Sequence, residues 1–222
     1  MHKKQRLMAR QPVWHDNYWL LLVQLYLRKP VGVKRLYSRE LVELAMELHV
    51  HPQYLHRMME KLDTAPVPSL KTMLDRYSNN SRRLAREVER LRGMSGFGDP
   101  ESFYDGVEVN EGFERRFKPI SGHEPLSEVM LVLLLDLYYR LTPQTMVEET
   151  PEVAEMAMML RIPVALVVEA LNAYCMCDPC LRARGGEGNN LLTPCREVWE
   201  EYADVNPNEL ARMASELKEY YK

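Results

Sequence analysis

Cysteine spacing is the clearest sign of metal chemistry in this chain of 222 residues. Cys177 and Cys180 are separated by two residues, as in a zinc knuckle, and four thiolates can complete a tetrahedral structural zinc site. The full candidate set is Cys175, Cys177, Cys180 and Cys195. The alternative is a group of free thiols that pack as small hydrophobic residues, because no second pair has this spacing. We favour that alternative, so the expected cofactor content is none, with structural zinc as the other outcome.

A second set of side chains is suited to contacting phosphate. Arg82, Arg86 and Arg90 are spaced four residues apart, so on a helix they form one basic row while the apolar residues between them face inward. A solvated face is the alternative, because Glu87 and Glu89 are available for intrahelical ion pairs. An N-terminal arm can also follow a nucleic-acid backbone or remain a free tail, and its basic residues are Lys3, Lys4, Arg6 and Arg10.

Catalytic motifs are missing from the sequence. It contains no nucleophile motif, no phosphate-binding glycine loop and no His-Glu-x-x-His. His49, His51 and His56 are close in sequence, but sequence alone assigns them no carboxylate or thiol partner. We therefore expect a protein that is not an enzyme.

The segments that must position these side chains occur twice in the sequence. Residues 25–62 match residues 137–174 without a gap, at an offset of 112. The match resumes at an offset of 126, where Leu84-Ala85-Arg86 corresponds to Leu210-Ala211-Arg212. Apolar residues recur with helical spacing in both copies, which predicts an all-α protein of tandem duplicated helical domains. The predicted helices are 16–28, 39–48, 52–62, 70–77 and 82–92, then 127–141, 152–160, 164–174, 196–202 and 208–221. Ser38 and Thr150 are the expected N-caps of the second helix in each copy.

Charge divides the chain in the same way. Residues 1–93 hold 18 Lys and Arg against 9 Asp and Glu, whereas residues 94–222 hold 11 against 23, within a net charge of −3. We therefore expect a basic domain at 1–93, a linker at 94–124 rich in Gly, Pro and acidic residues, and an acidic domain at 125–222. The asymmetry indicates an anionic partner for the basic half, or docking of the two halves on each other.

Two apolar runs, 18–27 and 129–141, are too short for a membrane span, which needs about 20 residues. We interpret them as buried core helices. Four cysteines, three of them clustered, do not resemble the disulfide framework of a secreted protein. The expectation is a cytoplasmic protein with no membrane partner.

The apolar residues of both copies carry a family resemblance. Those of the first copy stand at the spacings of the helix-turn-helix superfamily, and those of the second repeat them: Leu44, Ala45, Leu48, Val50, Leu55 and Met58, then Met156, Ala157, Leu160, Ile162, Val167 and Ala170. Each copy thus resembles a helix-turn-helix or winged-helix domain. Both depart from the family at the turn, where His49 and Arg161 replace the usual glycine and would pay for a positive φ. Residues 185–190, flanked by Arg182 and Arg184, resemble the wing of winged-helix proteins, which implies a small β-hairpin in the second copy. A surface loop is the alternative.

The resemblance also implies a function. In the superfamily the second helix enters the major groove, and its exposed N-terminal residues contact base edges. In the first copy these are His51, Gln53, Tyr54, His56, Arg57 and Lys61, and Arg82, Arg86 and Arg90 complete the candidate nucleic-acid-binding set.

The same face of the second copy is apolar or acidic, with Pro163, Val164, Ala165, Val168 and Glu169. We therefore expect a regulator-like protein whose first copy binds double-stranded DNA and whose second copy binds a protein partner or self-associates. The alternative is a non-enzymatic interaction or scaffold protein whose helix-turn-helix domains do not bind DNA.

Overall fold

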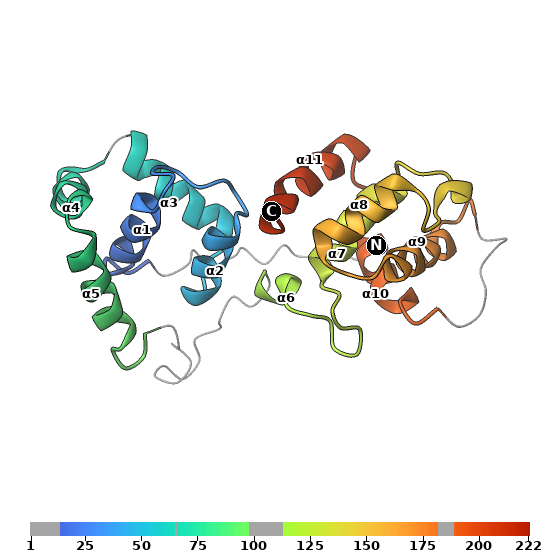
Figure 1. Ribbon diagram of the computed structural model, residues 1–222, viewed down its shortest axis with the longest axis horizontal. Coiled ribbons are helices and arrows are strands. Elements are labelled where there is room, and N and C mark those ends of the chain that lie inside the picture. Colours follow the sequence, from blue (N-terminus) through green and yellow to red (C-terminus); the bar gives the residue numbers. More distant parts are fainter. Residues whose placement is uncertain (1–13, 65, 98–112, 182–188) are drawn as a thin grey trace, which may run out of the picture. The chain divides into compact units, whose positions relative to one another are not determined.

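The computed structural model describes residues 14–64, 66–97, 113–181 and 189–222. Every regular element within these ranges is a helix (Figure 1), which confirms the predicted all-α class. The chain divides into two compact units, Met1–Lys34 with Glu43–Asn110 and Arg35–Val42 with Glu111–Lys222. We call them the first unit and the second unit.

The first unit is built around an apolar helix. It contains α1 (Tyr18–Leu27), the C-terminal part of α2 (Arg39–Glu47), α3 (Pro52–Thr64), α4 (Pro68–Ser78) and α5 (Ser81–Arg92). Helix α1 packs against both α3 and α5 and lies between them (Figure 1). For that reason four of its apolar side chains are buried, namely Leu21, Leu22, Val23 and Leu25. The hydroxyl of Tyr77 on α4 donates to the carboxylate of Glu87 on α5, which closes a hairpin of these two helices.

A tight turn with a left-handed residue joins α2 to α3. His49 has a φ of 51°. The Val50 N–H donates to the Ala45 carbonyl at 2.9 Å, and the His49 N–H donates to the Met46 carbonyl at 3.3 Å. These are the two bonds of a Schellman motif, which usually has glycine at the left-handed position. Val50 is buried, so its packing adds to the two bonds that fix the end of α2.

The second unit surrounds a central helix, α7 (Glu128–Tyr138), in which every residue from Leu131 to Tyr138 is buried. Its other helices are α6 (Glu114–Phe117), α8 (Pro151–Leu160), α9 (Val164–Cys177), α10 (Leu192–Tyr202) and α11 (Pro207–Leu217), with 3₁₀ turns η1 (Pro143–Thr145) and η3 (Lys218–Tyr220). Five helices pack against α7, namely α6, α8, α9, α10 and α11. The short α6 lies in the region predicted as a linker, and its flanking Phe113 is buried.

The turn between α8 and α9 has the same geometry as the turn between α2 and α3. Arg161 has a φ of 59°. The Ile162 N–H donates to the Ala157 carbonyl at 3.1 Å, and the Arg161 N–H donates to the Met158 carbonyl at 3.2 Å. Each of these atoms is 112 residues beyond its counterpart in the first turn. The sequence match is therefore accompanied by the same backbone conformation and the same two hydrogen bonds.

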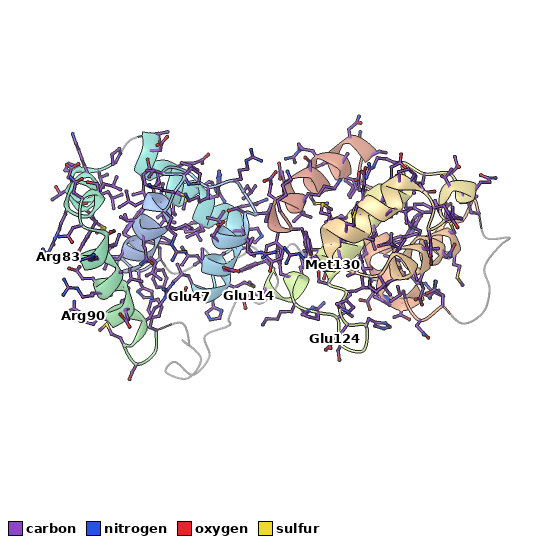
Figure 2. The ribbon with its side chains drawn as sticks, in the orientation of Figure 1. Glu47, Arg83, Arg90, Glu114, Glu124 and Met130 are labelled. Carbon is purple, nitrogen blue, oxygen red and sulfur yellow. The ribbon has the colours of Figure 1, made fainter. Side chains whose placement is uncertain are left out.

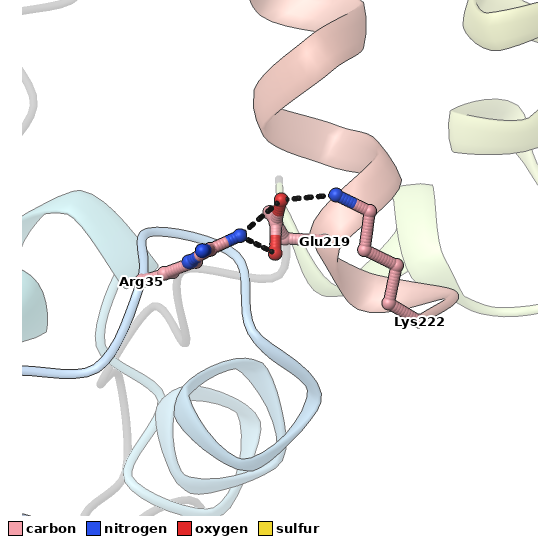
Figure 3. Close-up of polar contacts among 3 residues, drawn as sticks. All are labelled: Arg35, Glu219 and Lys222. Atoms are coloured by element: carbon pink, nitrogen blue, oxygen red, sulfur yellow. Dashed lines mark hydrogen bonds and ion pairs between the residues drawn. The ribbon is translucent and has the colours of Figure 1, made fainter. Parts of the chain in front are cut away.

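Residues 35–42, although they interrupt the first unit in sequence, belong to the second unit. The guanidinium of Arg35 donates to both carboxylate oxygens of Glu219 at 3.0 Å, and Lys222 donates to the same carboxylate at 2.6 Å (Figure 3). Arg39 lies over the ring of Tyr220. These contacts hold residues 35–42 against the C-terminal end of the chain.

Ser38 and Thr150 directly precede α2 and α8, as predicted for N-caps, but neither hydroxyl makes the expected capping hydrogen bond. The Ser38 hydroxyl is buried and has no hydrogen-bond partner in the described parts of the chain. The Thr150 hydroxyl turns back to donate to the Thr145 carbonyl at 2.6 Å, so it makes no side-chain cap for α8. Side-chain caps form at Asn80, Ser127 and Asn206, before α5, α7 and α11.

The expected wing falls largely outside the described residues, because Arg182, Arg184 and most of 185–190 lie in the range 182–188. Of the predicted turn, Asn189 is described. Its side-chain amide donates to the Glu169 carbonyl at 2.8 Å, and Leu191 then precedes the first residue of α10.

Candidate nucleic-acid interface

Three of the six predicted residues of the first helix pair share one exposed row on α3. Gln53, Arg57 and Lys61 are exposed and follow one another at intervals of four residues, which places them on one face of a helix. The opposite face is fixed in the core by Leu55, Met58, Met59 and Leu62. The Arg57 guanidinium also donates, through Nε, to the Gln53 carbonyl at 3.4 Å. This bond keeps the guanidinium close to the first turn of α3.

The other three predicted residues have local roles instead. The Gln53 N–H donates to His51 Nδ1 at 3.2 Å, which uses His51 at the start of α3. The ring of Tyr54 packs against Trp14, with 6.0 Å between centroids. His56 is half-buried, and its Nδ1 lies 3.7 Å from Glu60. These contacts divert all three side chains from a ligand that approaches the exposed row.

The charge of α3 is nearly balanced. Arg57 and Lys61 are accompanied on the same helix by Glu60 and Asp63, and Asp63 accepts a hydrogen bond from the Tyr26 hydroxyl at 2.7 Å. Hydrogen-bonding groups, rather than net positive charge, therefore distinguish this face.

Two of the five arginines on α5 form ion pairs, one with a carboxylate of the same helix and one with a carboxylate of α2. Arg83 pairs with Glu87 at 3.0 Å, and Arg92 pairs with Glu47 of α2 at 2.5 Å. The Tyr77 hydroxyl and Arg83 together hold the pKa of Glu87 below its usual value. Hydrogen bonding to Glu47 raises the pKa of Arg92. Figure 2 shows Arg83, Arg90 and Glu47 in place. The pairing of Arg92 with Glu47 could not be predicted from the sequence, because the two residues are 45 positions apart.

The remaining arginines of α5 form an exposed row without ion pairs. Within the described ranges, Arg82, Arg86 and Arg90 make no salt bridge with any carboxylate. Leu84, Val88 and Leu91 are buried on the other side of the helix, as predicted. The buried side of α5 packs against α1, so its arginine row faces away from α1. Helix α1 packs against both α3 and α5 and lies between them (Figure 1), so the two rows belong to helices on either side of α1.

The second helix pair presents a different surface. On α8, Met158 is 72% exposed. At the start of α9, Pro163 and Ala165 are exposed, while Val164, Val168 and Glu169 are half-buried. This face is apolar where the corresponding part of α3 has hydrogen-bonding side chains.

The four cysteines do not form one cluster. Cys195 is fully buried, and burial raises its pKa to about 12. The Cys175 thiol lies 3.5 Å from the Met146 sulfur, and Cys180 is exposed after the end of α9. The described residues contain no group of three or more His, Cys, Asp or Glu side chains arranged to hold a metal ion.

Sequence reasoning also gave no sign of a shallow groove in the second unit. It lies beside η1 and is lined in part by Arg140, Thr142, Gln144, Thr150 and Glu152. Arg140 is held by Asp136 at 3.0 Å. The N-terminal arm, Lys3 to Arg10, lies outside the described residues.

Comparison with known proteins gives no relative: no family model matches the chain, and no curated protein or solved structure is significantly similar to it. In the described part of the chain, all helices are too short or too polar to cross a membrane.

Proposed function

We propose that the chain is a tandem helix-turn-helix protein whose first unit binds double-stranded DNA through α3. The observation that carries the proposal is the Schellman turn at His49 followed by a helix with the exposed row Gln53, Arg57 and Lys61. A helix-turn-helix presents the exposed N-terminal half of its second helix to the major groove. The equivalent turn at Arg161 supports a common origin for the two copies.

Each member of the α3 row suits a different contact. Gln53 and Arg57 have the paired donors or acceptors that discriminate bases, since Gln matches adenine and Arg matches guanine. Lys61, one turn further along, suits a phosphate contact that fixes orientation. The three residues that form local contacts, His51, Tyr54 and His56, then support α3 rather than touch DNA.

The direct test is binding of the full chain to mixed-sequence duplex DNA across a salt series, with an Arg57→Ala variant beside the wild type. We expect measurable affinity at low salt that falls as salt rises. Loss of a bidentate base contact should cost about 1–3 kcal/mol on a preferred sequence. Arg212→Ala is the control, because Arg212 is an exposed arginine of the second unit that pairs with Glu216 at 2.6 Å. Absence of affinity at low salt would contradict the proposal.

A second candidate function is protein interaction through the second unit. Met158 is 72% exposed on α8, and Pro163 and Ala165 are exposed at the start of α9, and exposed apolar side chains can mark an interaction surface. If this face mediates self-association, sedimentation should reveal an oligomer that Met158→Glu dissociates. Met94→Glu in the first unit is the matched control, since Met94 is also exposed. A monomer at every concentration would count against self-association.

A further inference from the structure

We infer that the exposed arginine row of α5 is a second nucleic-acid contact, which binds the phosphates of a duplex independently of sequence. The row consists of Arg82, Arg86 and Arg90. The inference rests on the proposed function in one respect, that the partner is nucleic acid. It does not require that α3 recognise bases.

The first support is that some arginines of α5 are paired with carboxylates and others are not. Glu87 is engaged by Arg83 and by the Tyr77 hydroxyl, and Glu47 is engaged by Arg92. Because both carboxylates already have partners, neither is available to neutralise the row. Three guanidinium groups on one rigid helix are thus left to contact an anion, and the planar donor geometry of arginine matches phosphate.

The second support comes from α11, the helix 126 residues further along. It begins at Pro207 where α5 begins at Ser81, and it buries Leu210, Ala214 and Leu217 at the positions of Leu84, Val88 and Leu91.

The exposed positions of the two helices differ. Asn208, Arg212 and Glu216 of α11 occupy the places of Arg82, Arg86 and Arg90, and Arg212 pairs with Glu216 at 2.6 Å. The row on α11 therefore contains its own ion pair, whereas the corresponding row on α5 is wholly basic and has no ion pair among the described residues.

The residues beside the row favour one class of partner over two others. A helix that lies on a membrane needs large apolar residues beside its basic ones, and a single-stranded nucleic acid is held by aromatic residues that stack on bases. Ala85 is the uncharged neighbour on this face, and the apolar residues of α5 are buried. The row spans about 12 Å along the helix axis, and over that length one strand of B-DNA presents about four phosphates. A duplex backbone is the class of ligand that fits.

One group on the same face opposes binding. Glu89 is exposed on α5 and, in the described ranges, forms no salt bridge. Glu89 is three residues after Arg86 and seven after Arg82, which places it at the edge of the row, so it reduces the attraction of the row for phosphate. Removing its charge should therefore strengthen binding, which no structural role of the arginines would predict.

The experiment measures affinity of the full chain for two unrelated duplexes between about 50 and 200 mM salt. For the triple variant Arg82→Gln/Arg86→Gln/Arg90→Gln, the slope of log affinity against log salt should become shallower by about 2.7 on both duplexes. Glu89→Gln should tighten binding to both. Arg83→Gln is the matched control, because it removes the same charge from the same helix at a position already paired with Glu87.

The outcomes separate this inference from the proposed function. An unchanged slope in the triple variant would overturn the inference, even if Arg57→Ala still altered base preference. The inference would also be overturned if the single variants Arg83→Gln and Arg86→Gln lowered the affinity for duplex equally. The net charge of the chain, rather than the row, would then explain the loss. If the triple variant flattens the slope while Arg57→Ala changes neither affinity nor preference, the α5 contact stands and base recognition by α3 falls. Competition by anionic phosphatidylserine vesicles that is lost in the triple variant would overturn the choice of a duplex.

Discussion

His49 and Arg161, which are 112 positions apart, occupy the same left-handed backbone conformation, with φ of 51° and 59°. In both turns the next residue donates to the carbonyl five positions earlier, Val50 to Ala45 and Ile162 to Ala157. Neither residue is glycine, although glycine is the usual choice at this position of a Schellman motif. Both turns therefore combine a residue that has a Cβ with a positive φ, which costs free energy.

This cost predicts a gain in stability from glycine. A left-handed conformation costs a residue with a Cβ roughly 1–2 kcal/mol, partly offset by the extra flexibility of glycine in the unfolded chain. We expect His49→Gly and Arg161→Gly each to raise the free energy of unfolding by up to about 1 kcal/mol. His49→Val and Arg161→Val should lower it, since β-branched residues are disfavoured there. Urea unfolding measures both, and a loss of stability in the glycine variants would contradict this account of the turns.

The buried hydroxyl of Ser38 leads to an unusual prediction. Replacing a serine that caps a helix usually costs about 1 kcal/mol, but the Ser38 hydroxyl has no partner within the described residues. Ser38→Ala should leave stability unchanged or raise it, because a buried unpaired hydroxyl is itself costly. Ser127→Ala is the control. Ser127 is the N-cap of α7, its hydroxyl accepts from the Met130 N–H, and its replacement should cost about 1 kcal/mol. If Ser38→Ala and Ser127→Ala lowered the thermal unfolding temperature equally, this account of Ser38 would be wrong.

Asp136 is the one acidic residue of the otherwise apolar buried stretch of α7. It is 5% exposed and lies 3.0 Å from Arg140 and 3.6 Å from Lys218. Asp136→Asn should lower the free energy of unfolding by about 1–3 kcal/mol, because it weakens hydrogen bonds to charged groups. Lys218→Met should cost less, since Arg140 still pairs with the carboxylate. Chemical denaturation distinguishes them, and a larger loss from Lys218→Met would contradict this assignment.

Alkaline pH should weaken the second unit. Burial raises the pKa of the Cys195 thiol from 9.0 to about 12, and burial raises the pKa of the Tyr202 and Tyr221 hydroxyls from 10.0 to about 12. Above pH 9 the unfolded chain loses protons that the folded chain retains, so the contribution of these three groups to stability is constant below that pH and falls as pH rises towards 12. Each group steepens the fall by up to about 1.4 kcal/mol per pH unit.

Cys195→Ala isolates the first of these groups. In this variant the fall between pH 9 and 10 should become shallower but not vanish, because burial also raises the pKa of the Cys175 and Cys177 thiols. Urea midpoints measured from pH 7 to 11 check it. If the wild type and the variant have the same pH profile, Cys195 is not among the groups responsible.

Local patterns predicted much of the fold, whereas long-range contacts decided the candidate site. Periodic apolar residues such as Leu84, Val88 and Leu91 are buried as expected, because amphipathic spacing reflects burial directly. The four-residue helix α6 is too short for such a pattern. The role of Tyr54 depends on Trp14, 40 residues away in sequence, and the role of Arg92 depends on Glu47. No spacing rule contains such pairs. For the same reason, the separation of the α3 and α5 rows by α1 could not be foreseen.

The central claim, that the first unit is the DNA-binding unit, is tested most directly by mapping the contact surface. Backbone amide resonances of the full chain, isotope-labelled, are followed while a duplex is added at low salt. The account predicts shifts at Gln53, Arg57 and Lys61 on α3 and at Arg82, Arg86 and Arg90 on α5, with α8 and α9 unchanged. Shifts confined to the second unit, or none at saturating duplex, would contradict it.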